Sequence, residues 1–313
     1  MILYIFIGVC SLIWLVEFLF RIPKISNLSN KYVLITGCDS GFGNELAIQL
    51  DGKGMHVIAS CLTEKARHEL GSSLSRRSSA ILMNVADHGS VQEALNKVRE
   101  IIPKSEGLWG LVNNAGITGY GGAMEWWSRD EYKRVLDVNL FGLIDVTKVF
   151  TPMLKQGRGR IVNVASICGR VVIPEAGYCI SKFGVECFSD EIRVQLKAFG
   201  LSVCIIEPGF FKTAIADDGN VFAPVRAKWA ELSPETRHEF GGQEAFESKI
   251  AKVSKSLDSL ASRNTGKVVN AMEHALTAKY PKKRYSVGYD AKLYFIPLSY
   301  MPSVVTDFLF RDD

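Results

Sequence analysis

A tyrosine and a lysine four residues apart could act together on one hydroxyl group. If residues 178–182 are helical, Tyr178 and Lys182 share one face of the helix. A phenol with a pKa of about 10 is a poor base at neutral pH unless a neighbouring cation stabilises its phenolate. Ser166, which follows the apolar run 159–164, could hold a substrate oxygen beside the phenol. The spacing predicts an acid–base site, although Tyr-x-x-x-Lys taken alone fits an ordinary helix surface better.

The composition fits one large α/β domain and excludes several function classes. The chain has 313 residues, of which 47% are hydrophobic and 22% charged, so it can bury a substantial core. Its net charge of +4 is spread without a basic stripe, which argues against nucleic-acid binding. The seven cysteines have no paired short spacing, so we expect reduced thiols, with neither a disulfide framework nor a metal site.

The first twenty residues form an apolar run that is interrupted only by Glu17. A helix of that length is about as long as a bilayer core is thick, so residues 1–20 are predicted to be a membrane anchor. A cleaved signal peptide is the alternative, but no basic stretch precedes the run and no small-residue cleavage site follows it. Arg21 and Lys24 follow the run. By the positive-inside rule, the domain that follows the linker at residues 21–30 is therefore expected to lie in the cytosol.

A glycine-rich turn between a predicted strand and a predicted helix indicates a dinucleotide site. The strand covers residues 31–35, the turn 36–43 and the helix 44–50, so backbone amides and a helix N-terminus can approach a pyrophosphate. A second strand is predicted at residues 55–59. Glu64 lies 21 residues beyond Gly43, where a carboxylate would meet an adenosine ribose; a solvated glutamate at a helix start explains it equally well.

Strands and helices continue to alternate along the chain. The further strands are predicted at residues 80–83, 108–112, 159–164 and 201–206, and the helices at 90–102, 132–154, 178–199 and 266–280. This alternation predicts an α/β fold with a doubly wound, mainly parallel Rossmann-type sheet of about seven strands. The glycine loop, residues 113–116, Ser166 and residues 208–209 all follow strands, so they should rim one crevice. That convergence favours the acid–base interpretation of Tyr178.

These motifs together resemble the short-chain dehydrogenase/reductase family. They are Thr36-Gly-x-x-x-Gly-x-Gly43, Asn113-Asn-Ala-Gly116, Asn139, Ser166, Tyr178-x-x-x-Lys182 and Pro208-Gly-x-x-x-Thr213. Residues 31–44, 107–116, 181–186, 290–293 and 306–309 resemble more narrowly the membrane-bound retinol dehydrogenase and 3α-hydroxysteroid dehydrogenase branch. The resemblance implies an NAD-dependent oxidoreductase of the endoplasmic reticulum membrane that acts on all-trans-retinol/retinal or 3α-hydroxysteroids. It also allows a homodimer.

The resemblance assigns roles to particular residues. Tyr178 would be the proton acceptor, Lys182 would lower its pKa and hold the nicotinamide ribose, and Ser166 would bind the substrate oxygen. Asn139 would position a water relay from Lys182 to solvent. The cofactor would be bound by Gly37, Ser40, Gly41, Phe42, Gly43, Glu64, Asn84, Asn114, Ala115, Gly116, Tyr178, Lys182, Pro208, Gly209 and Thr213.

Two departures from the family pattern motivate a second hypothesis. Asn84 stands where relatives commonly have an aspartate that contacts adenine, and Ala165 replaces the first serine of a common pair. A catalytically silent, membrane-tethered cofactor or lipid binder of the same fold is therefore the alternative. The intact set of Ser166, Tyr178, Lys182 and Asn139 disfavours it.

The remaining segments concern substrate and cofactor selection. Within the domain at residues 31–280, the insert 210–265 either covers a lipophilic substrate with its aromatic residues or forms a small helical cap with its own apolar face. The apolar arm at residues 281–313, broken by prolines, either lies on the membrane surface or packs on the domain.

Asp39 and Glu64 would repel a 2′-phosphate and so favour NAD over NADP, whereas Lys65 and Arg67 nearby weaken that preference.

Overall fold

The computed structural model describes residues 2–173, 176–213 and 218–310 and contains one seven-stranded sheet. Every adjacent pair of strands is parallel, in the order β3-β2-β1-β4-β5-β6-β7. The strands are β1 (Tyr32–Ile35), β2 (His56–Cys61), β3 (Ser79–Leu82), β4 (Gly110–Asn113), β5 (Arg160–Val164), β6 (Ser202–Pro208) and β7 (Arg284–Val287). The predicted doubly wound parallel sheet is confirmed.

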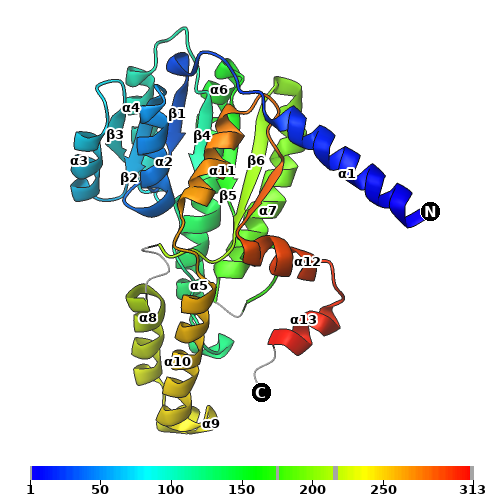
Figure 1. Ribbon diagram of the computed structural model, residues 1–313. Helices are drawn as coiled ribbons and strands as arrows, with labels where there is room; N and C mark the ends of the chain where they lie inside the picture. Colours follow the sequence, from blue (N-terminus) through cyan, green and yellow to red (C-terminus); the bar gives the residue numbers. More distant parts are fainter. Residues whose placement is uncertain (1, 174–175, 214–217, 311–313) are drawn as a thin grey trace.

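Helices cover both faces of this sheet (Figure 1). They are α2 (Gly41–Gly52), α3 (Glu64–Ser73), α4 (His88–Ile101), α5 (Arg129–Leu136), α6 (Leu143–Gly157), α7 (Tyr178–Gln195) and α11 (Gly266–Thr277). Side chains of α2 and α11 form one apolar cluster with alternate strand residues, and side chains of α4, α6 and α7 form another with the intervening ones. Burial on both faces explains why the central strands read as continuous apolar runs rather than alternating ones.

The helix predicted at residues 132–154 is longer and contains a π-helical segment. The π-helical segment η3 (Asp137–Gly142) lies directly between α5 and α6. Ser128 caps α5 through a reciprocal pair of hydrogen bonds with Glu131, so the helix begins where this capping box lies. π-Helical turns within longer helices are frequent at functional sites, and Asn139 lies in this one.

None of the strands whose residue ranges were predicted from the sequence corresponds to the edge strand β7. It is only four residues long, it begins with the charged Arg284, and its residues alternate between half-buried and buried. Hydrogen bonds from Arg284 to Glu186 and Asp190 on α7 satisfy that charge in the fold. Such a short segment after Pro281 lacks the apolar run that identifies the inner strands.

The insert forms a helical lobe that extends away from the sheet (Figure 1). Its helices are α8 (Asp218–Glu231), α9 (Pro234–Glu239) and α10 (Gly242–Leu260). The lobe has its own apolar cluster, in which Trp229 stacks on Phe246 with ring centroids 4.3 Å apart and also packs against Trp126. The lobe thus has an apolar face of its own, and its Val221 and Leu257 also line the cavity described below; that the insert covers a lipophilic substrate stays a prediction.

The two ends of the described chain form peripheral helices. Helix α1 (Ile2–Arg21) projects from the domain (Figure 1), and its last residue is held by hydrogen bonds to Tyr280 and His274. The C-terminal arm contains η7 (Ala291–Phe295), α12 (Ile296–Leu298) and α13 (Ser303–Phe310). Within the described residues, no single helix meets the length and apolarity needed to cross a bilayer. The segments Ala291–Leu298 and Ser303–Phe310 meet them only as a pair, with a bend of 120° between them.

Candidate active site

A cavity of about 450 Å³ lies beyond the carboxyl ends of the central strands, where the sheet order reverses. Fourteen of the predicted site residues line it: Gly37, Ser40, Gly41, Phe42, Asn84, Asn114, Ala115, Gly116, Ser166, Tyr178, Lys182, Pro208, Gly209 and Thr213. Gly43, Glu64 and Asn139 are not among the lining residues. The parallel strands thus bring together motifs that are far apart in the sequence.

The glycine loop leaves room for a ligand because its backbone is packed tightly on the other side. Gly37 has a φ of +68°, and a Cβ there would lie 2.6 Å from the Cα of Ala115. A Cβ on Gly43 would lie 2.5 Å from the Nδ2 of Asn114, so Gly43 serves close packing rather than ligand contact. Asn114 fixes the loop by donating a 2.9 Å hydrogen bond to the carbonyl of Gly37. Gly41 then begins α2, whose free N-terminal amides suit a pyrophosphate.

Asp39, rather than Glu64, presents a carboxylate to this cavity. Asp39 lines it and accepts hydrogen bonds from the amides of Leu62 at 2.8 Å and Thr63 at 3.0 Å, which fix the carboxylate at the end of β2. Glu64 lies in the first turn of α3, which Thr63 caps, and its exposed side chain accepts a 2.6 Å bond from Arg67. Glu64 is thus not among the side chains that line the cavity, and its predicted ribose contact stays a prediction.

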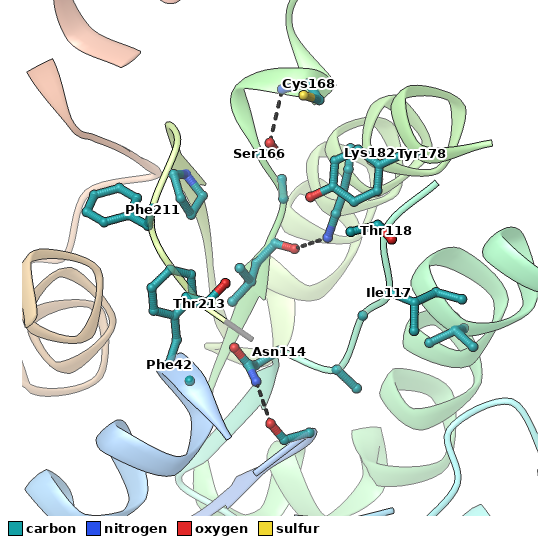
Figure 2. Close-up of a pocket in the computed structure, with 18 of the residues that line it drawn as sticks. Phe42, Asn114, Ile117, Thr118, Ser166, Cys168, Tyr178, Lys182, Phe211 and Thr213 are labelled. Carbon is teal, nitrogen blue, oxygen red and sulfur yellow. Dashed lines mark hydrogen bonds between the residues drawn. The ribbon is translucent and has the colours of Figure 1, made fainter. Parts of the chain in front are cut away.

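Ser166, Tyr178 and Lys182 lie together at one end of the cavity (Figure 2). The Oγ of Ser166 accepts a 3.1 Å hydrogen bond from the amide of Cys168, which fixes the oxygen and leaves the hydroxyl proton to be donated to a substrate. Tyr178 is the first residue of α7, directly after Gly177 with a φ of +80°. This turn and the helix start set the phenol beside the serine.

Lys182 is a buried cation one helical turn after Tyr178. Its Nζ lies 5.6 Å from the centroid of the Tyr178 ring and donates a 2.9 Å hydrogen bond to the carbonyl of Val164. Burial lowers the pKa of Lys182 to about 8, while the neighbouring Cys168 and Glu186 act in the opposite direction. An amine with this pKa can change its protonation near neutral pH.

Asn139 lies behind the cavity wall and fixes the loop that follows β4. Its side-chain oxygen accepts a 2.8 Å bond from the amide of Ile117, and its Nδ2 donates to the carbonyl of the same residue at 2.9 Å. The Nδ2 also donates to the Oγ of Ser181 on α7 at 3.1 Å. A Cβ added to Gly116 would lie 3.3 Å from the Asn139 Oδ1 and 3.8 Å from the Lys182 Nζ, so Asn139 is close to the lysine.

The two departures from the family pattern both lie at the cavity. The Oδ1 of Asn84 accepts a 3.1 Å hydrogen bond from the amide of Ala86, so this oxygen already stabilises the turn after β3. Ala165 is buried and precedes Ser166, which lines the cavity as well. Neither residue blocks the space between the glycine loop and Tyr178.

The cavity also includes residues that were absent from the predicted site. They are Asp39, Leu62, Met83, Val85, Ile117, Thr118, Val138, Val164, Ala165, Ile167, Cys168, Phe210, Phe211, Val221 and Leu257. Many directly follow strand ends, a position that could have identified them. The rings of Phe42 and Phe211 meet edge to face with centroids 5.9 Å apart, so part of this wall is aromatic.

Comparisons with known proteins agree with this geometry. A family model described as short chain dehydrogenase matches residues 31–221. Retinol dehydrogenase 16 of Rattus norvegicus is 45% identical, covering 95% of this chain and 93% of that protein. Retinol dehydrogenase 5 of Homo sapiens is 44% identical, covering 95% of this chain and 93% of that protein. Short-chain dehydrogenase/reductase family 9C member 7 of Homo sapiens is 46% identical, covering 91% and 90%.

Solved structures show the same fold. A short-chain dehydrogenase from Streptomyces avermitilis superposes with a TM-score of 0.69 at 24% identity, covering 89% of this chain and 94% of that one. A short chain dehydrogenase/reductase from Burkholderia phymatum, in complex with NAD, superposes with a TM-score of 0.69 at 23% identity, covering 86% and 92%.

Proposed function

Because this chain belongs to the short-chain dehydrogenase family, and is thus an oxidoreductase that binds a nicotinamide cofactor, we propose that it oxidises a lipophilic alcohol with NAD. The substrate class is all-trans-retinol/retinal, 3α-hydroxysteroids, or both. The observation that carries the proposal is the convergence of Ser166, Tyr178 and Lys182 on an apolar cavity that reaches the glycine loop. The names of the retinol dehydrogenases that match over most of the chain support the retinoid.

The residues of the cavity fit a dinucleotide. The positive φ values of Gly37 and Gly41 let the loop approach a ligand without a side chain in the way, and the first turn of α2 offers free amides to a pyrophosphate. Ser40, Phe42, Asn114, Ala115, Gly116, Pro208, Gly209 and Thr213 would form the rest of the cofactor site. When bound, the nicotinamide supplies the hydride acceptor.

The chain's own side chains would handle the proton. Ser166 would donate a hydrogen bond to the substrate oxygen, and Tyr178 would take the hydroxyl proton as general base. Lys182, as an adjacent buried cation, favours the phenolate that this step requires. Asn139, which holds the loop at Ile117 close to Lys182, would position a water relay from Lys182 to solvent.

We propose NAD rather than NADP because of the charges around the end of β2. The carboxylate of Asp39 is fixed at the cavity and would repel a 2′-phosphate. The two nearby cations are paired with carboxylates of the same helix, Arg67 with Glu64 at 2.6 Å and Lys65 with Glu69 at 4.0 Å. Both ion pairs are solvent-exposed and therefore weak. They reduce the attraction of Arg67 and Lys65 for a 2′-phosphate but do not remove it.

For the chain ends, we propose that α1, although its described residues do not meet the criteria for a bilayer-spanning helix, is the anchor in the endoplasmic reticulum membrane, and that the catalytic domain faces the cytosol. Phe18, Leu19 and Phe20 of α1 are each more than half exposed, and contact of such an apolar surface with water is unfavourable. Arg21 and Lys24 follow them, as the positive-inside rule requires for a cytosolic domain. The arm from residue 281 would lie on the membrane surface, because its exposed side chains include many large apolar ones.

A turnover assay on the purified full-length protein tests the proposed activity. We expect NADH formation with all-trans-retinol, with a 3α-hydroxysteroid such as androstanediol, or with both. NADP should give a lower kcat/KM than NAD, and an Asp39→Ala variant should lose that preference. If neither alcohol supports turnover although NADH binds, the alternative holds, and the chain is a silent cofactor or lipid binder.

A further inference from the structure

Asp290 makes a long-range contact that its place in the chain does not require. It directly precedes the π-helical segment η7 and already lies in the first helical turn, with a φ of −54° and a ψ of −50°, so its backbone is not that of a capping residue. Among the described residues, its side chain makes no capping bond either. Its Oδ2 instead accepts a 2.7 Å hydrogen bond from the amide of Phe210, which lies 80 residues earlier in the chain. Helix capping therefore does not explain the carboxylate.

The carboxylate occupies a space that two glycines leave open. A Cβ on Gly209 would lie 2.1 Å from the Oδ2 of Asp290, and a Cβ on Gly288 would lie 2.2 Å from its Oδ1. Real Cβ atoms essentially never approach so closely, so no side chain fits at either glycine while Asp290 stays in place. The contact with Phe210 is thus enclosed by backbone on two sides.

The segment that Asp290 holds is a wall of the cavity. Gly209, Phe210 and Phe211 all line it. The amide of Gly209 donates to the carbonyl of Val287 at 2.8 Å, and the carbonyl of Phe210 accepts from the amide of Ser262 at 2.9 Å. With the Asp290 bond added, three hydrogen bonds fix the backbone of this wall, one to Ser262 and two to the stretch 287–290.

The arm that begins at Asp290 also packs behind the other end of the site. Ala291, Phe295 and Leu298 form one apolar cluster with Ile167, Cys168, Val171 and Cys179, and the partly buried Tyr178 and Phe210 pack against it. The rings of Phe210 and Phe295 meet edge to face with centroids 5.8 Å apart. The arm therefore contacts the segment after Ser166, the start of α7 and the wall at Phe210.

We propose that Asp290 is a positioning residue, which ties the C-terminal arm to the wall Gly209–Phe211 and so fixes that wall relative to Ser166 and Tyr178. The role rests on the proposed function for the reaction it serves. Displacing a reacting geometry by about 1 Å can lower rates by up to about 10²-fold, so a modest loosening of this wall should be measurable.

The kinetic test compares two substitutions that differ in their ability to reach Phe210. Asp290→Asn keeps an oxygen acceptor at the same place, whereas Asp290→Ser keeps a small polar residue that suits a helix start but is too short to reach the amide. Rates are expressed per NADH-binding site. We expect Asp290→Asn to stay within about threefold of the wild type, and Asp290→Ser to lose about tenfold in kcat/KM for the alcohol.

Two further variants separate this role from a general effect on the arm. Asp307→Ser removes an exposed carboxylate from α13 of the same arm and should leave kcat/KM unchanged. Gly209→Ala disturbs the same contact from the other side and should reproduce the loss of Asp290→Ser. If Asp290→Ser lowers only the melting temperature, while kcat/KM per NADH-binding site stays at the wild-type value, the residue is merely structural and the proposal is rejected.

Hydrogen exchange at Phe210 gives a readout that is independent of substrate. The Phe210 amide should exchange faster in Asp290→Ser than in the wild type or Asp290→Asn. Unchanged protection in Asp290→Ser would overturn the proposal. If the wild type turns over neither alcohol but Asp290→Ser still loses protection at Phe210, the proposed function fails while the anchoring of the wall by Asp290 stands.

Discussion

At the scale of single residues, the site pairs a half-buried phenol with a fully buried amine. Tyr178 and Lys182 come from one helical turn, and Ser166 reaches them from the segment after β5. Ser166 is proposed as a hydrogen-bond donor, Tyr178 as the general base and Lys182 as a cation. Substitutions of the three residues should therefore affect kcat and cofactor affinity differently.

Tyr178→Phe should abolish most turnover while leaving the cofactor site in place. The substitution removes the group that would take the substrate proton but keeps the ring that packs against the apolar cluster containing Ile167 and Phe295. We expect kcat to fall by at least about 10²-fold, with the Kd for NADH nearly unchanged. Steady-state kinetics and a fluorescence titration of NADH measure the two quantities. Near-normal oxidation by Tyr178→Phe would refute the assignment.

Lys182 should make cofactor affinity depend on pH. Burial lowers its pKa to about 8, so the ammonium group loses its proton as the pH rises through that value. If the charged form holds the cofactor, the Kd for NADH should rise above about pH 8. Lys182→Arg stays charged throughout, so its affinity should be lower overall but nearly independent of pH. Titrations between about pH 6.5 and 9.5 check this, and a flat wild-type profile would contradict it.

At the scale of elements, the edge strand β7 is attached to α7 by charges. Arg284 donates hydrogen bonds to the buried Glu186 at 2.9 Å and to Asp190 at 2.6 Å. Its Nε also lies 3.5 Å from the buried Glu207 on β6. Glu207 keeps its partners Arg170 and Ser286 if Arg284 is removed, but the buried Glu186 loses the cation that hydrogen-bonds it. Leaving such a buried carboxylate without its partner costs more than the pair itself contributes.

Arg284→Ala should therefore destabilise the fold by roughly 3 kcal/mol, the lower end of the cost of breaking a buried pair. Burial and the nearby Glu207 raise the pKa of Glu186 to about 7, above its ordinary value. Glu186 is thus charged at about pH 8 and takes up a proton as the pH falls through 7, so the destabilisation should be smaller at about pH 6. Chemical denaturation at both pH values measures it.

The control for that experiment is an exposed ion pair. Arg226 donates to Glu247 at 2.8 Å, with both side chains largely in solvent. Arg226→Ala should leave the unfolding midpoint nearly unchanged, because exposed pairs are screened by water and salt. Equal effects of the two arginine substitutions would show that β7 does not depend on its buried charges.

Elements with a strong local signal were predictable, and those that depend on distant contacts were not. The inner strands were found because both of their faces are buried, which requires an apolar run. β7 was missed because its charged first residue is satisfied only by side chains of α7. Glu64 was favoured on spacing alone, although Asp39, already noted for its charge, becomes the cavity carboxylate only once β2 ends beside the glycine loop. Likewise, the bond of Asp290 to Phe210 has no sequence signature.

At the scale of the whole molecule, a compact catalytic domain is flanked by two apolar ends. Helix α1 projects from the domain (Figure 1). The arm ending in α13 presents exposed side chains such as Met301, Val304 and Phe308. The ends differ in their relation to the site. The arm packs behind Ser166 and Tyr178, whereas the described hydrogen bonds between α1 and the domain are made by Arg21, its last residue.

Deleting residues 1–20 should weaken membrane attachment without impairing the site. We expect the truncated protein to shift from the membrane pellet towards the supernatant after carbonate extraction, with its NADH affinity retained. Deleting residues 299–313 as well should complete the release if the arm lies on the membrane surface. Added protease should degrade the domain of the intact protein in sealed microsomes. A protected domain would show that the orientation is wrong.

The position of β7 and Asp290 near the end of the chain has a consequence for biosynthesis. The glycine loop leaves the ribosome early, but β7, which completes the sheet, and Asp290, whose carboxylate fixes the wall at Phe210, are synthesised after the other six strands. At about 5–20 residues per second, roughly tens of seconds separate the two events. Between the synthesis of β6 and that of β7, roughly 4–15 seconds at the same rate, the nascent chain exposes the unpaired edge of β6, which can recruit other strands. A premature stop before residue 284 would leave that edge open permanently, so such products should be cleared by quality control rather than accumulate as partial enzymes.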